Sequence, residues 1–420
     1  MGHRHQQGPV LFLEDGSGSG GVQRFGKGLV VLIGRKVTVL GAGVAGLAVA
    51  RALALRGAEV TVLEQADAIR EVGAGLQISP NGARVLHALG LGEALAAAGP
   101  QAEAIELREG ETGKRVTRLD LARLRPGEEY RLLHRARLIE LLAEGARAAG
   151  VEIRLQSRVA EVMLGPHPPR LKMLKGEEIE TGLLIGADGL QSRVRRALNG
   201  EGRPFFTHQV AWRTLIPCDD AEPKVAQVFM GDGRHLVSYP IGRGLRNIVA
   251  VEERQRWTAE GWSHRDDPRS LLAAFEEFCP QVQDWLEAVK EPWLWGLFRH
   301  RVARVWQGRG AAILGDAAHP TLPFMAQGAV MALEDAWVLA ASLAEAQSDA
   351  EGLAAYQAAR RGRCEAIVEA ANENARNYHL SGPARVIGHL ALRTASAIAP
   401  GKILGRFDWV YGHDVTAPRK

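Results

Sequence analysis

The first regular pattern along the chain lies in residues 36–66, KVTVLGAGVAGLAVARALALRGAEVTVLEQA. Residues 37–40 form a short, β-branched and apolar run, which is typical of a strand buried on both faces. The alanine-rich stretch 47–55 favours a helix, and residues 59–63 repeat the apolar strand pattern. This order predicts a strand, a helix and a parallel strand, the βαβ unit of a doubly wound sheet.

Further along, the pattern changes twice. A helix is predicted over residues 135–149, and short apolar runs at 183–185 and 311–314 are typical of further buried parallel strands. Between about 205 and 252, short alternating stretches separated by turns predict an antiparallel sheet with a core of its own. From residue 329 onward the pattern is mostly helical.

These patterns predict an α/β protein with a Rossmann-like domain, an inserted antiparallel-sheet domain and a helical C-terminal region. Each of the two domains is discontinuous in the sequence. We expect the Rossmann-like domain to comprise residues 35–105, 130–200 and 303–345, the inserted domain residues 106–129 and 201–302, and the helical region residues 346–420. Residues 1–34 are polar and rich in Gly and Ser, and we expect a disordered extension there.

Composition narrows the class of protein. Hydrophobic residues make up 46% and charged residues 24% of the chain, as in ordinary globular domains. The net charge of +4 favours an anionic small molecule but is too weak and scattered for nucleic acid. Cys218, Cys279 and Cys364 are far apart, which fits a reducing cytoplasmic location. No apolar run reaches the roughly 18 residues that an integral membrane segment needs.

The glycine turn after the first strand carries specific chemistry. Gly41 suits the tight turn, Gly43 lets the backbone approach a pyrophosphate, and Gly46 lets the helix pack closely on the strand. The helix N-terminus offers free N–H groups and a positive dipole end to phosphates. Glu64, at the end of the second strand, can accept hydrogen bonds from a ribose. Together these residues predict dinucleotide binding.

Two more segments place an acidic residue directly after a predicted buried strand. In GADGLQSRVRRAL (186–198), Asp188 either contacts a dinucleotide or caps the following helix. In GDAAHPTLPFMAQGA (315–329), Asp316 and His319 admit three interpretations: metal ligands, a catalytic dyad or a cofactor-gripping loop. We favour the loop, since no third ligand of matching spacing appears, and expect His319 to organise it.

The glycine turn with Glu64, residues 186–198 and residues 315–329 resemble the three flavin fingerprints of class A FAD-dependent aromatic monooxygenases, in their salicylate-hydroxylase-like branch. LLHRARLIELL (132–142) and FDWVYGHD (407–414) fit as well, so the resemblance covers about residues 36–414. It implies a p-hydroxybenzoate-hydroxylase-like fold, in which the Rossmann-like domain binds FAD and the inserted sheet forms the substrate domain.

The resemblance also implies an activity. NADH or NADPH, as a transient co-substrate, reduces FAD, and O₂ then forms a flavin C4a-hydroperoxide that hydroxylates a phenol, hydroxybenzoate or salicylate-like ring. The expected partners are therefore this small aromatic substrate, NAD(P)H and O₂. A homodimer is compatible with the resemblance.

The resemblance assigns roles to particular residues. The cofactor-binding residues it implies are Gly41, Gly43, Ala45, Gly46, Glu64, Gln65, Gln77, Arg135, Val159, Asp188, Asp316, Gly328 and Ala329. The substrate-lining residues it implies are Trp212, Arg213, Pro323 and Phe324. Arg213 either pairs with a substrate carboxylate or forms a structural ion pair, and the sequence favours the structural role.

The catalytic candidates are His235 and Tyr239 in RHLVSYPIG. They are four residues apart on a predicted strand and so face the same side, about 13 Å apart. By resemblance they orient the substrate phenol and remove its proton, which suits a His or a Tyr in a relay; on the residues alone, simple packing is the commoner role.

Two other functions stay open at this point. The apolar segment 383–404 permits association with a membrane surface, as in a ubiquinone-pathway or isoprenoid-type hydroxylase. We expect it instead to form a helix packed on the FAD domain. A flavin-binding regulatory protein without turnover is the third alternative.

Overall fold

The computed structural model describes residues 32–69, 74–257 and 263–418. The predicted βαβ unit is confirmed: β1 (Lys36–Leu40), α1 (Val44–Ala54) and β2 (Glu59–Leu63), with β1 and β2 parallel. Most of the expected extension lies outside the described residues. Leu32 is an exception, because its side chain is buried in the core and its N–H donates to Arg56 O at 2.8 Å.

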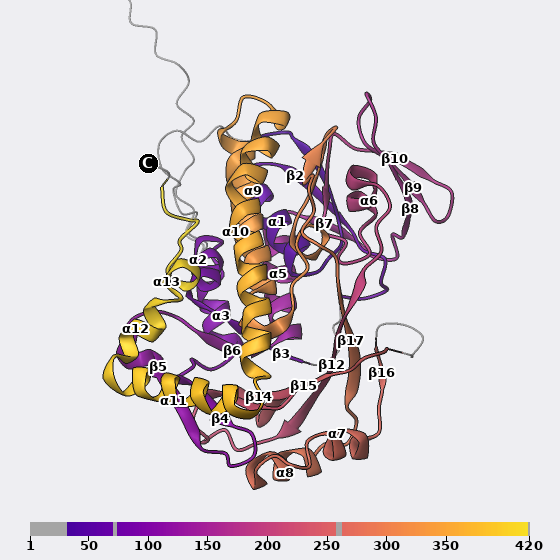
Figure 1. Cartoon of the computed structure of the whole chain (residues 1–420). Helices are drawn as coiled ribbons and strands as arrows, with labels where there is room; N and C mark the ends of the chain where they lie inside the picture. Colours follow the sequence, from indigo (N-terminus) through magenta and orange to yellow (C-terminus); the bar gives the residue numbers. More distant parts are fainter. Residues whose placement is uncertain (1–31, 70–73, 258–262, 419–420) are drawn as a thin grey trace, which may run out of the picture.

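The first sheet has six strands in the order β18-β19-β11-β1-β2-β7, with β1 near its centre. The remaining strands are β7 (Glu152–Arg154), β11 (Leu183–Gly186), β18 (Gln307–Gly308) and β19 (Ala311–Ile313). Helix α1 packs against α5 (Arg135–Ala148) and α9 (Gly328–Glu345), and α10 (Asp349–Tyr378) packs on α9. Figure 1 shows α10 running from the first sheet to the second.

The second sheet has eight strands in the order β16-β17-β12-β15-β14-β13-β4-β5. Its strands are β4 (Ala104–Glu109), β5 (Arg115–Asp120), β12 (Phe205–Pro217), β13 (Val225–Gly231), β14 (Arg234–Gly242), β15 (Leu245–Glu253), β16 (Ser263–Arg265) and β17 (Trp293–Arg299). The predicted antiparallel core is present, but β4 joins β13 in parallel and makes the sheet mixed. Helices α7 (Pro268–Ala274) and α8 (Pro280–Glu287) cover one face (Figure 1).

Smaller elements surround the two sheets. A ribbon of β3 (Gly75–Ile78) and β6 (Arg131–His134) lies beside the second sheet, and β8 (Val159–Met163), β9 (Arg170–Met173) and β10 (Glu178–Glu180) form a three-stranded sheet. The short helices are α2 (Pro80–Ala88), α3 (Gly92–Ala98), α4 (Leu121–Leu124), α6 (Arg193–Asn199), η1 (Gly315–Ala317) and η2 (Pro323–Met325). β4 of the second sheet begins at residue 104, two residues before the inserted domain is expected to start. The boundaries of the two domains otherwise stay a prediction.

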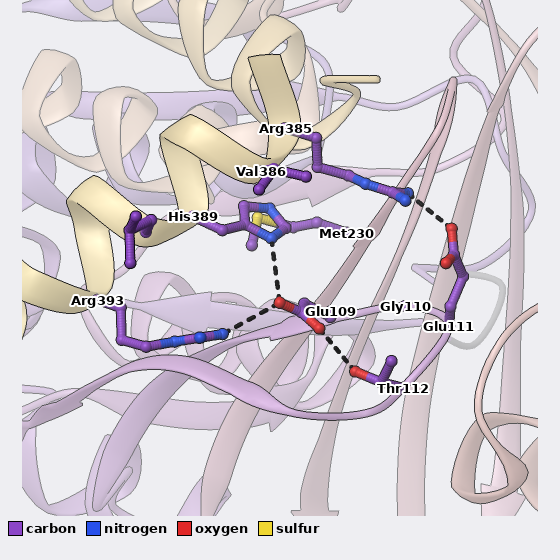
Figure 2. A pocket seen from close by; sticks show the side chains of 10 residues that line it. Glu109, Gly110, Glu111, Thr112, Met230, Arg385, Val386, His389 and Arg393 are labelled. Atoms are coloured by element: carbon purple, nitrogen blue, oxygen red, sulfur yellow. Dashed lines mark hydrogen bonds and ion pairs between the residues drawn. The ribbon is translucent and has the colours of Figure 1, made fainter. Parts of the chain in front are cut away.

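The C-terminal region continues as α11 (Gly382–Ile398), α12 (Pro400–Gly405) and α13 (Asp408–Tyr411). Contrary to our expectation, α11 packs on β5 of the second sheet and not on the FAD domain. A pocket of about 240 Å³ lies between α11 and the β4–β5 hairpin. Arg385 and Arg393 pair there with Glu111 and Glu109 (Figure 2). Part of the helix stays open to solvent: Ile387 is 68% and Leu390 60% exposed.

Candidate active site

The glycine turn has the geometry that a pyrophosphate requires. Gly41 has φ +105°, and a Cβ there would lie 2.5 Å from the carbonyl oxygen of Ala187. A Cβ on Gly46 would lie 1.9 Å from the carbonyl oxygen of Gly41, so helix and strand need both glycines. At Gly43 a Cβ would meet no atom of the described chain within 4 Å. The N-terminus of α1 is therefore open to a ligand at Gly43.

Glu64 is held rigidly at the end of β2. Its Oε2 accepts the Ala42 N–H at 2.8 Å and its Oε1 accepts the Ala66 N–H at 2.9 Å. The neighbouring Gln65 is exposed. The segment that leads to the buried Val159 lies next to Glu64, since the Ser157 N–H donates to Glu64 O at 2.8 Å. A carboxylate fixed beside the glycine turn suits a ribose.

The segment 315–329 also packs closely against α1. Gly315 has φ +59°, and a Cβ on it would approach the Ala45 Cβ to 2.9 Å. Asp316 is exposed, whereas its neighbours on either side are buried. Beyond the loop, α9 begins at the half-buried Gly328 and Ala329, so that its first N–H groups are accessible.

These residues fit FAD. Three features lie around one end of the parallel sheet, where such folds bind dinucleotides. They are the open N-terminus of α1, the Glu64 carboxylate and the exposed Asp316 after β19. Arg135, half-buried, begins α5 and donates its N–H to Ala74 O at 2.9 Å. These observations support the cofactor half of the site as a proposal.

The Asp188 carboxylate already has hydrogen-bond partners within the protein. Its Oδ2 accepts the Arg193 N–H at 2.7 Å, and its Oδ1 accepts from the Ser192 hydroxyl, so the carboxylate caps α6. Burial raises the pKa of Asp188, against these hydrogen bonds, which lower it. Of the two roles left open by the sequence, the structure displays the helix cap, while the adjoining Ala187 carbonyl packs on Gly41.

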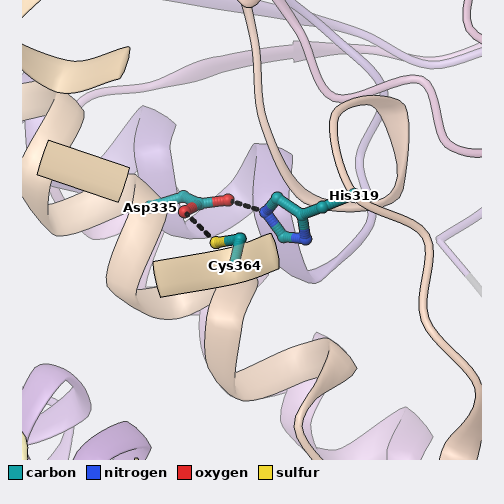
Figure 3. Close-up of side chains that lie close together, drawn as sticks. All are labelled: His319, Asp335 and Cys364. Atoms are coloured by element: carbon teal, nitrogen blue, oxygen red, sulfur yellow. Dashed lines mark hydrogen bonds and ion pairs between the residues drawn. The ribbon is translucent and has the colours of Figure 1, made fainter. Parts of the chain in front are cut away.

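His319 organises the loop through a buried ion pair with Asp335 of α9 (Figure 3). Asp335 also accepts the Gly315 N–H at 3.1 Å and pairs with Arg360 of α10 at 2.8 Å. Cys364 lies close enough to complete a possible metal ligand set. The Arg360 guanidinium, however, already supplies a cation against Asp335, and its Nη2 donates to Cys364 Sγ at 3.6 Å. We therefore interpret the cluster as structural.

The charges in this cluster reinforce one another. Burial disfavours charge on His319, but Asp335 outweighs this and raises the pKa of His319 well above its usual range. In turn His319 and Arg360 overcome burial and hold the pKa of Asp335 far below that of a free carboxyl. A buried, charged network thus fixes the loop that presents Asp316.

Three of the predicted substrate-side residues lie on one face of the second sheet. His235 and Tyr239 both lie on β14, and strand register places Val251 opposite His235 and Asn247 opposite Tyr239. Arg213 of β12 faces the same side, opposite Val249. The prediction that the two catalytic candidates share a face is confirmed by this register. Both side chains are buried.

Trp212 does not belong to this face. Consecutive strand residues point to opposite faces, and Trp212 packs with Phe275 in the core beneath α7 and α8. Its indole N–H donates to Asp266 at 2.7 Å. The prediction that Trp212 lines the substrate site together with Arg213 is therefore wrong, because adjacent strand positions cannot share a face.

The loops that the sequence assigns to the flavin side close over this sheet face. The Phe324 ring lies edge-on to His235, with ring centroids 5.3 Å apart, while Pro323 is exposed. Gly75 N–H donates to Asn247 Oδ1 at 2.6 Å, and a Cβ on Gly75 would lie 2.9 Å from the Tyr239 ring. The short strand β3 can pass this close to the substrate sheet only with glycine.

Tyr239 is connected to the cofactor half through β3. Its hydroxyl interacts with Gln77, which also accepts the Tyr130 hydroxyl at 2.7 Å. Burial raises the pKa of Tyr239 above its usual value, although Arg213 and Gln77 act in the opposite direction. Tyr239 is thus a neutral hydroxyl at neutral pH, able to donate one hydrogen bond and accept another.

Sequence reasoning missed two residues next to His235. His379 follows α10, and its Nε2 lies 2.7 Å from His235 Nδ1. Its other ring nitrogen, Nδ1, lies 2.7 Å from Glu253 Oε1 at the end of β15. These residues are separated by more than a hundred positions along the chain, and no local pattern marks them.

Comparison with known proteins agrees with the geometry. The FAD binding domain family matches residues 35–371. 3-Amino-4-hydroxybenzoate 2-monooxygenase PtmB3 of Streptomyces platensis is 34% identical, over 90% of this chain and 96% of that protein. 3-Hydroxybenzoate 6-hydroxylase of Polaromonas naphthalenivorans is 30% identical over the same shares.

A solved structure matches as well. Klebsiella pneumoniae HpxO complexed with FAD and uric acid superposes with a TM-score of 0.78 at 26% identity, over 89% of this chain and 96% of that one. The fold class and the family resemblance predicted from the sequence are both confirmed. The chain belongs to the FAD binding domain family, as an FAD-dependent monooxygenase related to these hydroxybenzoate hydroxylases.

Proposed function

We propose that this enzyme hydroxylates a hydroxybenzoate-like ring, using NAD(P)H and O₂. The observation that carries the proposal is the shared sheet face of His235, Tyr239 and Arg213, which lies against the flavin-side loops. A phenol needs a proton acceptor and an oriented hydroxyl, and a benzoate carboxylate needs a cation. Relatives named for 3-amino-4-hydroxybenzoate and 3-hydroxybenzoate support this substrate class.

When bound, FAD supplies the activation of O₂ and the transfer of one oxygen atom to the ring. The chain's own residues do the rest. Gly41, Gly43 and the start of α1 hold the pyrophosphate, Glu64 a ribose, and Asp316 the ribityl chain. Backbone N–H groups at Gly328 and Ala329 would lie against the flavin ring system and favour negative charge there.

On the substrate side, Tyr239 orients the ring hydroxyl and His235 accepts its proton, because a phenolate donates more electron density to the ring than a phenol. Arg213 pairs with the carboxylate, and Phe324 excludes water from the reacting face. The comparisons favour neither a ubiquinone-pathway hydroxylase nor a regulatory protein. Among the helices of the described residues, none is long and apolar enough to cross a membrane.

The test is substrate-stimulated oxidation of NADH and NADPH across a panel of hydroxybenzoates, aminohydroxybenzoates and hydroxypyridines, with products identified by mass. At least one hydroxybenzoate should stimulate oxidation and gain one oxygen atom. Tyr239→Phe keeps the ring packed under Gly75 but removes the hydroxyl, so hydroxylation should fall by about tenfold or more with FAD content unchanged. If no member of the panel is hydroxylated, the proposal is wrong.

A further inference from the structure

Two buried histidines and one exposed glutamate connect the substrate face to solvent in an unbroken line. His235 is 1% exposed, His379 is 8% exposed, and the side chain of Glu253 is 54% exposed. The two links between them are both 2.7 Å long. The three residues come from β14, from the residue after α10 and from the end of β15, so each belongs to a different element.

We propose that Glu253, His379 and His235 form a proton relay that carries the substrate's phenolic proton from the buried sheet face to solvent. The inference rests on the proposed function, because it requires a hydroxylated ring at His235. It assigns His379 and Glu253 as positioning residues that act through His235.

The hydrogen-bond geometry determines the tautomers. A carboxylate only accepts, so His379 Nδ1 carries its hydrogen toward Glu253. In neutral His379, Nε2 is then bare and accepts from His235 Nδ1–H. In neutral His235, the remaining nitrogen, Nε2, is therefore the unprotonated one. Since the hydrogen bond to His379 uses His235 Nδ1, Nε2 is the ring nitrogen that would meet the substrate hydroxyl as a base.

The surroundings of the relay disfavour a positive charge on either histidine ring. Tyr378 and Phe324 lie against the His235 ring at centroid distances of 5.3 Å. Burial, and next the neighbouring His379, lower the pKa of His235 well below its usual range. Burial also lowers the pKa of His379, although Glu253 and the more distant Asp232 act to raise it. A buried imidazolium is thus disfavoured, and a coordinated shift avoids forming one.

The transfer balances as three proton moves. The substrate O–H breaks and N–H forms at His235 Nε2; His235 Nδ1–H passes to His379 Nε2; His379 Nδ1–H passes to Glu253, which releases the proton to water. Each electron pair stays on the atom that loses the proton, so the ring is left as a phenolate. Reprotonation of the product oxygen along the same path restores both tautomers.

The experiment measures phenolate formation directly. The FAD-loaded enzyme is mixed rapidly with 4-hydroxy-3-nitrobenzoate, a benzoate whose phenolate absorbs visible light. The pH is kept below the pKa of the free probe's phenol, so that the probe enters protonated and the rate of phenolate appearance on the enzyme is followed. Glu253→Gln still accepts a hydrogen bond from His379 but cannot take up a proton, so the rate should fall by about tenfold or more with an unchanged dissociation constant for the probe.

A matched control is available in the same strand. Glu252 pairs with Arg254 at 2.7 Å and, as the adjacent strand position, points to the opposite face. Glu252→Gln should therefore keep the wild-type rate. His379→Gly should also slow the proton transfer, and added imidazole should restore it; a purely structural role for His379 predicts no such rescue.

The outcomes separate the two proposals. If wild-type enzyme ionises the probe and both Glu253→Gln and His379→Gly keep its rate, the relay is wrong and the proposed function stands. If wild-type enzyme neither ionises the probe nor hydroxylates any phenol of the panel, the proposed function is wrong and the relay falls with it.

Discussion

Asp316 and Asp188 both follow a buried parallel strand, yet the two carboxylates have different surroundings. Asp188 is bonded to Ser192 and to backbone N–H groups of α6, and this capping satisfies its charge within the protein. Asp316 is exposed in an otherwise buried segment. Exposure of an acid at the dinucleotide end of the sheet marks Asp316 as the residue with capacity for a ligand.

Replacing Asp316 by Ala should therefore weaken FAD binding. Loss of one charge-assisted hydrogen bond costs about 1.5–3 kcal/mol, or roughly a tenfold to hundredfold increase in the dissociation constant. The measurement is titration of the apoprotein with FAD. Glu93→Ala, an exposed acid on α3, is the control and should bind normally. Wild-type affinity in Asp316→Ala would remove Asp316 from the cofactor site.

At the level of elements, α9 and α10 hold the cofactor loop through charge. Asp335 and Glu334 of α9 are fully buried, and both pair with Arg360 of α10, at 2.8 and 2.6 Å. Glu334 also accepts from Asn81 of α2 at 2.7 Å. Such pairs are costly to break, because one partner is left charged in the interior.

Asp335→Asn should lower the free energy of unfolding by about 3–5 kcal/mol near neutral pH. The folded pKa of Asp335 is depressed, so its contribution is complete above the unfolded value of about 3.9 and is lost as pH falls through the folded value. His319 has a raised folded pKa, so its contribution is complete below the unfolded value of about 6.5 and is lost as pH rises from there through the folded value.

Urea unfolding of wild type and Asp335→Asn across pH isolates this network. The difference between the two proteins should be largest between about pH 4 and 6.5, and should shrink below pH 4. A difference that stays constant into acid would contradict the ion pair, and would assign the loss to packing alone.

Faces of single elements were predictable where the pattern is local. The period of two correctly placed His235 and Tyr239 on one side of β14, and the glycine turn placed Gly41, Gly43 and Glu64 together. Which face of β12 is turned toward the first domain was not readable, because apolar residues such as Val210 and Ala211 occupy the positions of both faces. Packing of α7 and α8 decided that question.

At the scale of the whole molecule, the C-terminal tail returns to the FAD domain. Val410 is fully buried, and the carbonyl oxygens of Trp409 and Val410 accept hydrogen bonds from Arg363 of α10 at 2.6 and 2.9 Å. Arg84 of α2 donates to Tyr411 O at 2.8 Å. The tail therefore fastens α10 and α2 together at the cofactor side.

Val410→Asp should detach this tail, because an unpaired buried carboxylate costs about 3 kcal/mol or more. Trypsin should then cleave after the exposed Lys402 or Arg406 about a hundredfold faster. Trp409→Asp is the matched control, since Trp409 is 44% exposed and its side chain leaves the bonded carbonyl in place. Equal cleavage of the two variants would show that the tail is not held by Val410.

Short-range sterics and periodicity account for what the sequence alone establishes here: the βαβ unit, the dinucleotide turn, the strand carrying His235 and Tyr239, and the family. Each of these depends on residues close together in the chain. The contact between His379 and His235 depends on the tertiary structure. Helix α10 is long enough to reach from the Arg360 ion pairs to the second sheet, and this brings His379 to His235 across 144 positions. No local preference encodes that distance, because it depends on how the domains pack against one another.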